Sequence, residues 1–466
     1  MPPTVAGALA NYAASLMGKV PVNLNYTLSS EALGSCIEQC NIRTVVTSKA
    51  FLEQIKLDVP VETILLEDVA KSIGVGSKLA AVLASALLPV GLLEKFLGSK
   101  RRASMDDLAT VIFSSGSTGA PKGVMLSHYN VVSNIQQIGQ AFALDRHDRI
   151  LGILPFFHSF GFTGTLWLPP LLGLGAVYHP NPVDGRGIGE LVCEHRATFL
   201  LATPTFLQIY IRACTPEQFG SVQFVLAGAE KLPERLAVAF EDRFGLRPME
   251  GYGTTETSPV VTINTRDFRS AGFRQVGAKR GSIGHPLPGM VARIVDPDTG
   301  VPVALGQAGL LLVKGPNVMQ GYLGQAEKTA EVLRDGWYTT GDIAAMDQDG
   351  FLAITDRLSR FSKIGGEMVP HIKVEEQLHE LGSLTDQTFA LTGVPDERKG
   401  ERLVVLYQNL DESAVQSIVE KLNGCDLPNI WKPRGDQFFK VEALPYLGTG
   451  KLDLKHVKTL ATELSP

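Results

Sequence analysis

The chain has 466 residues, of which 44% are hydrophobic and 20% charged, and its formal net charge is −5. This balance is typical of a globular protein with room for two or more domains, and it excludes a chain that is disordered or embedded throughout in a membrane. Because the net charge provides no basic field for a phosphate backbone, nucleic acid is a poor candidate partner. The odd count of five cysteines favours a reducing compartment over a disulfide framework.

The first distinctive segment, residues 79–93, reads LAAVLASALLPVGLL and is shorter than the ~20 residues of a spanning helix. Lys78 and Lys95 flank it, and Arg101 and Arg102 follow, which suits a segment lying in a membrane interface above anionic lipid. A buried core helix is the other interpretation of the same run. The N-terminus lacks the basic start of a signal peptide, so we expect a cytoplasmic protein, with peripheral contact to the inner face of the cell membrane as an open alternative.

Short apolar runs alternate with helix-like stretches from Val45 to about Ala304, which predicts an α/β protein with a parallel or mixed sheet covered by helices. The composition changes near residue 356, from two strand-like runs to a basic, glycine-bearing stretch followed by a helical pattern. We therefore predict a large N-terminal α/β domain at residues 1–355 and a small α+β C-terminal domain at residues 356–466.

Residues 110–123, TVIFSSGSTGAPKG, form an apolar run that leads into a loop of hydroxyls and glycines ending in Lys122. Glycines let a backbone approach phosphate closely, hydroxyls donate hydrogen bonds, and the lysine adds positive charge. The spacing differs from that of the nucleotide-triphosphatase loop G-x-x-x-x-G-K-[ST]. The sequence therefore predicts a phosphate-binding loop of another kind.

Four further motifs follow in order: GYGTTET (251–257), WYTTGD (337–342), DRLSRFSKIGGEMV (356–369) and LGTGKLD (447–453). With SSGSTGAPKG, they resemble the motifs of the adenylate-forming superfamily of acyl-CoA synthetases, luciferases and peptide-synthetase adenylation domains. The resemblance implies the adenylate-forming fold with a mobile C-terminal domain, and ATP and Mg²⁺ as cofactors. Because that family carries further residues before the position of Met1, we expect an N-terminally shortened form.

The resemblance also implies the site. Its nucleotide-binding residues would be Ser114, Ser115, Gly116, Ser117, Thr118, Gly119, Lys122, Gly228, Ala229, Glu230, Gly251, Tyr252, Gly253, Thr254, Thr255, Asp342, Arg357 and Lys451. The catalytic residues would be Lys451, Thr255, Glu256 and Lys122, with Glu256 and Thr118 as ligands of Mg²⁺. Lys451 would bridge the substrate carboxylate and the α-phosphate, and Asp356 would be the hinge of a domain rotation between the two half-reactions.

Residues 154–176 are rich in Phe, Leu and Gly and carry no acidic or basic residue apart from His158, which suits a hydrocarbon chain better than an amino acid. We expect Phe157, His158, Phe160 and Gly228 to bind the acyl group. His158 could gate an acyl tunnel or be a satisfied, partly buried histidine, and the sequence favours neither.

A closer resemblance is to bacterial acyl-carrier-protein synthetase modules associated with a lysophospholipid acyltransferase. It is carried by VPVNLNYTLS (20–29), PNVMQGYLG (316–324) and RLSRFSKIGGEMVPHIKVEE (357–376). It implies transfer of a long-chain fatty acyl group to the phosphopantetheine thiol of acyl carrier protein. Coenzyme A as acceptor, and a non-catalytic nucleotide- or lipid-binding fragment, are the alternatives. HPNPVD (179–184) matches the acyltransferase pattern H-x-x-x-x-D, but we interpret it as accidental because two prolines intervene.

Overall fold

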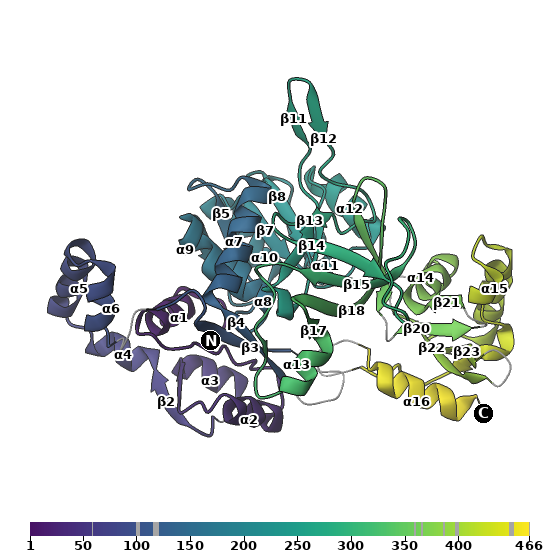
Figure 1. Cartoon of the computed structure of the whole chain (residues 1–466), viewed down its shortest axis with the longest axis horizontal. Helices are drawn as coiled ribbons and strands as arrows, with labels where there is room; N and C mark the ends of the chain where they lie inside the picture. Colours follow the sequence, from purple (N-terminus) through teal and green to yellow (C-terminus); the bar gives the residue numbers. More distant parts are fainter. Residues whose placement is uncertain are drawn as a thin grey trace. The chain divides into compact units, whose positions relative to one another are not determined.

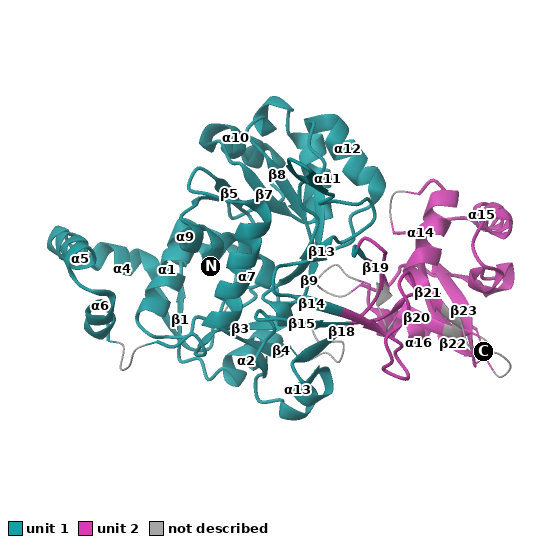
Figure 2. Cartoon of the chain, turned by 45° about the horizontal axis from the view of Figure 1, so that its top comes forward, with its two compact units in different colours: residues 1–292, 312–339, 350–352 teal, residues 293–311, 340–349, 353–466 magenta. Residues whose placement is uncertain are grey.

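The structure is a computed structural model that describes residues 1–57, 59–98, 103–114, 121–357, 360–364, 367–384, 387–396, 400–446 and 452–465. For Asp356, Arg357, Lys363, Glu367 and Met368 it describes the backbone alone. The chain forms two compact units (Figure 2). Unit 1 comprises residues 1–292, 312–339 and 350–352, and unit 2 comprises residues 293–311, 340–349 and 353–466. The boundary predicted at residue 356 remains a prediction.

A seven-stranded mixed sheet forms the centre of unit 1 (Figure 1). Its strand order is β13 (His285–Pro286), β10 (Val260–Ile263), β9 (Met249–Gly253), β8 (Phe224–Ala227), β7 (Phe199–Ala202), β5 (Arg149–Gly152) and β6 (Gly175–Tyr178). The pairs from β6 to β9 are parallel, and β10 is antiparallel to both β9 and β13. The predicted α/β class with parallel and mixed sheets is thereby confirmed.

Helices connect the parallel strands, as such strands require. They are α10 (Gly185–His195), α11 (Pro204–Ala213) and α12 (Glu234–Phe244), and α7 (His128–Phe142) precedes β5. Strands β7 and β8 are buried along their whole length, which explains their unbroken apolar sequences. The rings of Phe142, Phe199 and Phe224 meet with centroids 5.1 to 5.7 Å apart and join α7 to the sheet.

Among the residues that the structure describes before residue 358, the chain forms four smaller sheets. One has the order β16 (Gly321–Tyr322), β4 (Lys122–Ser127) and β3 (Leu108–Ser114); a second pairs β1 (Thr44–Thr47) with β2 (Glu62–Leu65) in parallel; and a third is the hairpin of β11 (Phe268–Ser270) and β12 (Phe273–Gln275). The fourth has the order β14 (Val291–Val295), β15 (Gly309–Lys314), β18 (Trp337–Met346) and β17 (Leu333–Arg334), with β19 (Leu352–Arg357) paired to β18. The remaining helices up to residue 332 are α1 (Val5–Leu16), α2 (Ser30–Gln39), α3 (Lys49–Ile55), α4 (Leu66–Ser72), α5 (Val75–Leu87), α6 (Val90–Phe96), α8 (Ser159–Gly161), the π-helix η1 (Phe162–Trp167), α9 (Leu168–Leu172) and α13 (Ala326–Val332).

Unit 2 contains a sheet with the order β21 (Glu367–Pro370), β20 (Phe361–Ile364), β23 (Gly400–Tyr407) and β22 (Phe389–Asp396), with β24 (Phe438–Lys440) beside β23. Alternate residues of β22 and β23 face two separate apolar cores, as the two-residue period of a strand requires. One core includes residues of α14 (His371–Leu381) and α15 (Glu412–Gly424), and the other includes residues of α16 (Leu454–Leu464).

Residues 79–93 fall mostly within α5 and α6, and neither helix contains a buried residue. The interpretation of this run as a buried core helix is therefore wrong. Pro89 separates the two helices and no other element covers them enough to bury a side chain among the described residues. Among all the residues that the structure describes, no single helix has the length and apolarity needed to cross a membrane. Helices α4 and α5 meet those criteria only when taken together, as a pair bent by 90°.

Candidate active site

The predicted phosphate-binding loop begins and ends on adjacent strands. Ser114 ends β3, Lys122 begins β4, and the two residues are direct partners in the antiparallel register. The loop residues between them, Ser115, Gly116, Ser117, Thr118 and Gly119, lie outside the described residues, so the roles predicted for them remain predictions. The Nζ atom of Lys122 lies 5.3 Å from the ring centroid of Tyr322, which is on the next strand, β16.

The GYGTTE motif forms the end of β9 and a tight reversal into β10. Gly253 is required by sterics, because a Cβ atom there would lie 1.9 Å from the carbonyl oxygen of Pro259. The Thr254 amide donates to that same oxygen at 3.0 Å, and Thr255–Thr257 form one turn of 3₁₀ helix. The reversal places Glu256 and Thr257 in the protein interior and leaves Thr255 partly exposed.

Two buried asparagines hold this reversal in place. Asn134 on α7 donates through Nδ2 to Val260 O at 2.8 Å and accepts from Val260 N at 3.1 Å. Asn317 donates through Nδ2 to Thr257 O at 2.6 Å and to Val260 O at 2.9 Å. Both side chains are fully buried, and buried polar groups of this kind rigidify a loop when they are hydrogen-bonded.

Glu256 is a buried acid held by a tyrosine. The Tyr322 hydroxyl donates to Glu256 Oε1 at 2.9 Å, and Glu256 is only 9% exposed. Burial and the nearby Glu256 carboxylate raise the pKa of the Tyr322 hydroxyl well above its ordinary value, so it remains a proton donor. Burial, then Glu256, also raises the pKa of Tyr338, which is only 4% exposed.

This carboxylate fits a magnesium ligand. Mg²⁺ commonly takes one or two carboxylates from the protein and completes its shell with water and substrate phosphate. No three His, Cys, Asp or Glu side chains form a metal cluster within the described part of the chain, and such an ion does not require one. Glu256, held by the Tyr322 hydroxyl, would bind the ion near the predicted phosphate-binding loop, which ends at Lys122.

The AGAE segment follows β8, the neighbour of β9 in the sheet. Ala229 has a φ of +70°, a left-handed conformation that costs a residue with a side chain of order 1 kcal/mol and is most frequent at functional sites. Glu230 is exposed and accepts a hydrogen bond from Thr205 Oγ1 at 3.0 Å. Gly228 is buried and directly precedes the strained residue.

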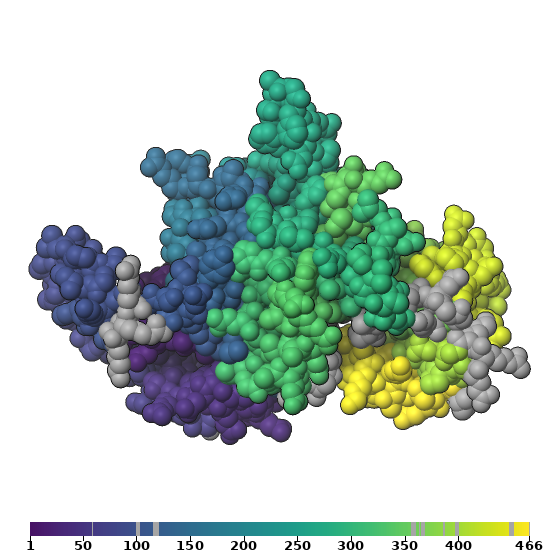
Figure 3. Space-filling view, viewed as in Figure 1, coloured from purple at the N-terminus to yellow at the C-terminus, as the bar shows by residue number. Residues whose placement is uncertain are grey.

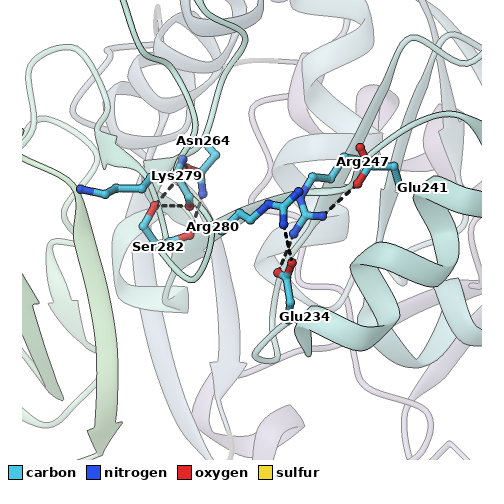
Figure 4. Close-up of polar contacts among 7 residues, drawn as sticks. All are labelled: Glu234, Glu241, Arg247, Asn264, Lys279, Arg280 and Ser282. Atoms are coloured by element: carbon cyan, nitrogen blue, oxygen red, sulfur yellow. Dashed lines mark hydrogen bonds and ion pairs between the residues drawn. The ribbon is translucent and has the colours of Figure 1, made fainter.

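Ion pairs and hydrogen bonds anchor the segments on either side of β9 (Figure 4). Arg247, before β9, bonds Glu234 at the start of α12 at 2.5 Å and Glu241 at 2.9 Å. Beyond β10, Asn264 accepts from the Lys279 amide at 3.1 Å and from Ser282 Oγ at 3.1 Å. The AGAE loop, which leads into α12, and the GYGTTE strand are thus braced through neighbouring elements.

Of the predicted acyl-binding residues, Phe160 lies against Gly228 of the AGAE loop. A Cβ atom on Gly228 would lie 3.2 Å from Cε1 of Phe160, so the ring covers the glycine closely. Phe157 is buried with its ring centroid 4.5 Å from that of His158 and 4.9 Å from that of Tyr26. His158 itself is exposed, not partly buried. Phe160 lies in the short helix α8, which leads directly into the π-helix η1, and π-helical turns are frequent at functional sites.

The remaining predicted residues belong to unit 2. Asp342 on β18 is 5% exposed, and its amide donates to Thr340 Oγ1 at 3.1 Å. Lys451 and the side chains of Asp356 and Arg357 lie outside what the structure describes, so their roles are untested.

Sequence reasoning missed four residues that order the site: Tyr322, Tyr338, Asn134 and Asn317. Asn134 lies on the buried face of α7 together with two other amides, Asn130 and Gln137, and no motif pointed to it. The two tyrosines lay within motifs but had no assigned role, since no local pattern indicates that their hydroxyls approach Glu256.

Residues 1–323 match the protein family described as AMP-binding enzyme, and the chain belongs to this family. It is 37% identical over 303 residues to a long-chain-fatty-acid–CoA ligase of Bacillus subtilis (strain 168), covering 63% of this chain and 51% of that protein. It is 36% identical over 301 residues to a feruloyl-CoA synthase of Amycolatopsis sp, covering 64% and 58% respectively. In these matches the chain spans little more than half of the relative's length. A probable 4-coumarate–CoA ligase 3 of Dictyostelium discoideum is 30% identical over 470 residues, covering 95% of this chain and 81% of the relative.

Among solved structures, ATP-bound MatB from Rhodopseudomonas palustris superimposes with a TM-score of 0.78 and 25% identity, covering 99% of this chain and 88% of that one. MenE from Bacillus subtilis with its acyl-adenylate intermediate has a TM-score of 0.77 at 23% identity, covering 98% and 86%. The predicted adenylate-forming α/β fold is confirmed.

Proposed function

We propose that this chain is an AMP-forming acid–thiol ligase that activates a fatty acid with ATP and transfers the acyl group to coenzyme A. The observation that carries the proposal is the buried Glu256 carboxylate, fixed by Tyr322 on a strand adjacent to the one that Lys122 begins. A lysine and a carboxylate that would bind Mg²⁺ thus lie on or beside the strands that flank the predicted phosphate loop.

In the first half-reaction a carboxylate oxygen of the acid attacks the α-phosphorus of ATP, and the bond to pyrophosphate breaks. Both partners are negative, so catalysis needs positive charge and fixed geometry more than covalent chemistry. Lys122 would neutralise phosphate charge, and Thr255 would donate to the α-phosphate. When bound at Glu256, Mg²⁺ would supply further positive charge to the phosphates. Lys451 would bridge the carboxylate and the α-phosphate, a role that rests on its motif.

In the second half-reaction a thiolate attacks the acyl carbonyl carbon and AMP leaves. The hinge at Asp356, and binding of the nucleotide by Asp342 and Arg357, are proposed from their motifs. Names of relatives support coenzyme A as the acceptor, since they include long-chain-fatty-acid–CoA ligases of Bacillus subtilis and Salmonella typhimurium. Acyl carrier protein, with an associated acyltransferase, finds no support among these names.

A fatty acid is favoured by the contact of the Phe160 ring with Gly228, which is apolar, and by the absence of an acidic side chain, lysine or arginine from residues 154–176. Feruloyl-CoA synthase and 4-coumarate–CoA ligase relatives make an aromatic acid the second candidate.

The test is pyrophosphate release with ATP, Mg²⁺ and a panel of fatty, ferulic and coumaric acids, with coenzyme A or holo acyl carrier protein as acceptor. We expect release that depends on a fatty acid and a thioester with coenzyme A. Lys451→Ala should abolish release, whereas Lys455→Ala, an exposed lysine on α16, should not. Binding of ATP by the folded protein without release for any acid would overturn the proposal in favour of a non-catalytic nucleotide-binding protein.

A further inference from the structure

Helices α5 and α6 present an unusual amount of apolar side chain to solvent. Val75, Leu79, Leu87 and Phe96 are 84%, 61%, 74% and 79% exposed. Figure 3 shows this segment in violet-blue at the left edge of the view, with its side chains on the surface. Contiguous exposed apolar surface of this kind marks an interaction site.

The large apolar side chains of α5 form one stripe. They follow the helical spacing i, i+4, i+7, i+8 and i+12: Val75, Leu79, Val82, Leu83 and Leu87. Lys78 borders this stripe, because it lies three residues after Val75 and four before Val82. In α6, Val90, Leu92 and Phe96 are also more than half exposed. The segment therefore combines a helix that carries an uncovered apolar stripe with a short apolar extension.

The charge of the surrounding sequence is opposite to that of the chain. Residues 71–102 contain six basic residues and one acidic residue, Glu94, a net charge of +5 in a chain whose formal charge is −5. No acidic residue occurs between positions 71 and 93. Such a segment complements an anionic surface. A second copy of the same segment would instead bring two positively charged segments together, with Lys71, Lys78 and Lys95 against the single acid Glu94 in the described residues 71–98 of each, which opposes self-association.

From these observations we propose that α5 and α6 dock on the surface of an anionic lipid bilayer. The apolar stripe would enter the boundary between headgroups and acyl chains, and the flanking lysines would lie among the phosphates. The uncharged run of residues 79–93 is too short to span, so the segment lies along the surface instead of crossing it. The proposal of docking depends only on the exposed apolar side chains and the charge of this segment. Its purpose, uptake of fatty acid from the bilayer, rests on the proposed function.

The experiment is co-sedimentation of the full chain with vesicles, without ATP or fatty acid. Failure of the proposed function therefore does not affect the result. One set of vesicles contains phosphatidylcholine with phosphatidylglycerol, and the other contains phosphatidylcholine alone. We expect binding to the anionic vesicles, and at least tenfold weaker binding to the neutral vesicles and at high salt.

The paired variant Leu79→Glu with Leu83→Glu should reduce binding at least tenfold. Its control is Val301→Glu with Leu305→Glu, which makes the same kind of change at residues of similar exposure, 59% and 62%, and should leave binding unchanged. All four side chains are exposed, so folding should survive, and circular dichroism verifies it. Lys78→Glu with Lys95→Glu tests the charge contribution independently and should reduce binding about tenfold or more.

Three outcomes would overturn the proposal: no binding of the wild-type chain to anionic vesicles, equal loss in the control pair, or equal binding by all variants. A wild-type dimer that Leu79→Glu with Leu83→Glu makes monomeric, without vesicle binding, would assign the surface to a second copy instead.

Discussion

The hydroxyl of Tyr322 donates a hydrogen bond to Oε1 of Glu256 at 2.9 Å, and the same tyrosine ring lies 5.3 Å from Lys122 Nζ. One side chain thus contacts both the acid proposed to bind Mg²⁺ and the lysine that follows the phosphate loop. These three residues come from β4, the turn after β9, and β16.

Tyr322→Phe should raise the Mg²⁺ concentration needed for half-maximal pyrophosphate release by about three- to tenfold. It removes a hydrogen bond to a charged group and frees the carboxylate to rotate. A magnesium titration of release measures the effect. Tyr210→Phe is the matched control, because Tyr210 OH donates to Pro182 O at 2.8 Å on other elements and should not change the Mg²⁺ requirement. An unchanged requirement in Tyr322→Phe would show that Tyr322 has no positioning role.

Gly253→Ala should destabilise the protein by about 2 kcal/mol or more and weaken ATP binding. The added Cβ would lie 1.9 Å from a backbone oxygen, so the reversal after β9 must shift. Gly34→Ala is the control, since nothing lies within 4 Å of a Cβ there in helix α2, and it should stabilise by about 0.5–1 kcal/mol. Urea unfolding and nucleotide titration measure both effects. Unchanged stability of Gly253→Ala would contradict the close approach.

Gly228→Ala should raise KM for the acid by about three- to tenfold with little change in KM for ATP. The new methyl would press on Phe160 Cε1 at 3.2 Å but would be an ordinary 3.8 Å from Gly251 O. Steady-state kinetics with each substrate varied separately distinguish the two. A larger effect on ATP would place Gly228 on the nucleotide side of the site.

Unit 2 should lose stability as the pH falls below about 6.5. Burial, reinforced by the charges of Arg360 and Lys458, lowers the pKa of His371 to about 3, and its Nε2 lies 2.7 Å from Ser362 Oγ. Between pH 6.5 and 3 the unfolded chain binds a proton at His371 and the folded chain does not. The free energy of unfolding therefore has its full value above pH 6.5 and decreases as the pH falls from 6.5 to 3. At pH 5 the loss from this group is about 2 kcal/mol.

Urea unfolding at pH 7.5 and pH 5 tests this. His371→Gln should remove that part of the pH dependence even if it lowers stability at both pH values. His147→Gln, at an exposed histidine, should not. The same pH dependence in His371→Gln and wild type would refute the assignment.

The family and the α/β class were predictable from the sequence, because the motifs are local. Each is a short run that combines glycines or hydroxyls with charged residues, and the physical demands on it, such as close backbone approach at Gly253, act over a few neighbouring residues. The alternation of apolar runs with helical stretches likewise depends on local periodicity, and the structure has the mixed sheet that it predicts.

Only the tertiary structure decided which of these residues meet and which surfaces remain uncovered. Tyr322 reaches Glu256 across 66 positions, and Asn317 reaches Val260 across 57, because strand pairing sets these distances and no local pattern encodes it. For residues 79–93, likewise, only the tertiary structure shows that the segment remains uncovered. Its apolar composition suits both a core and a surface helix, and only the placement of the other elements leaves it exposed.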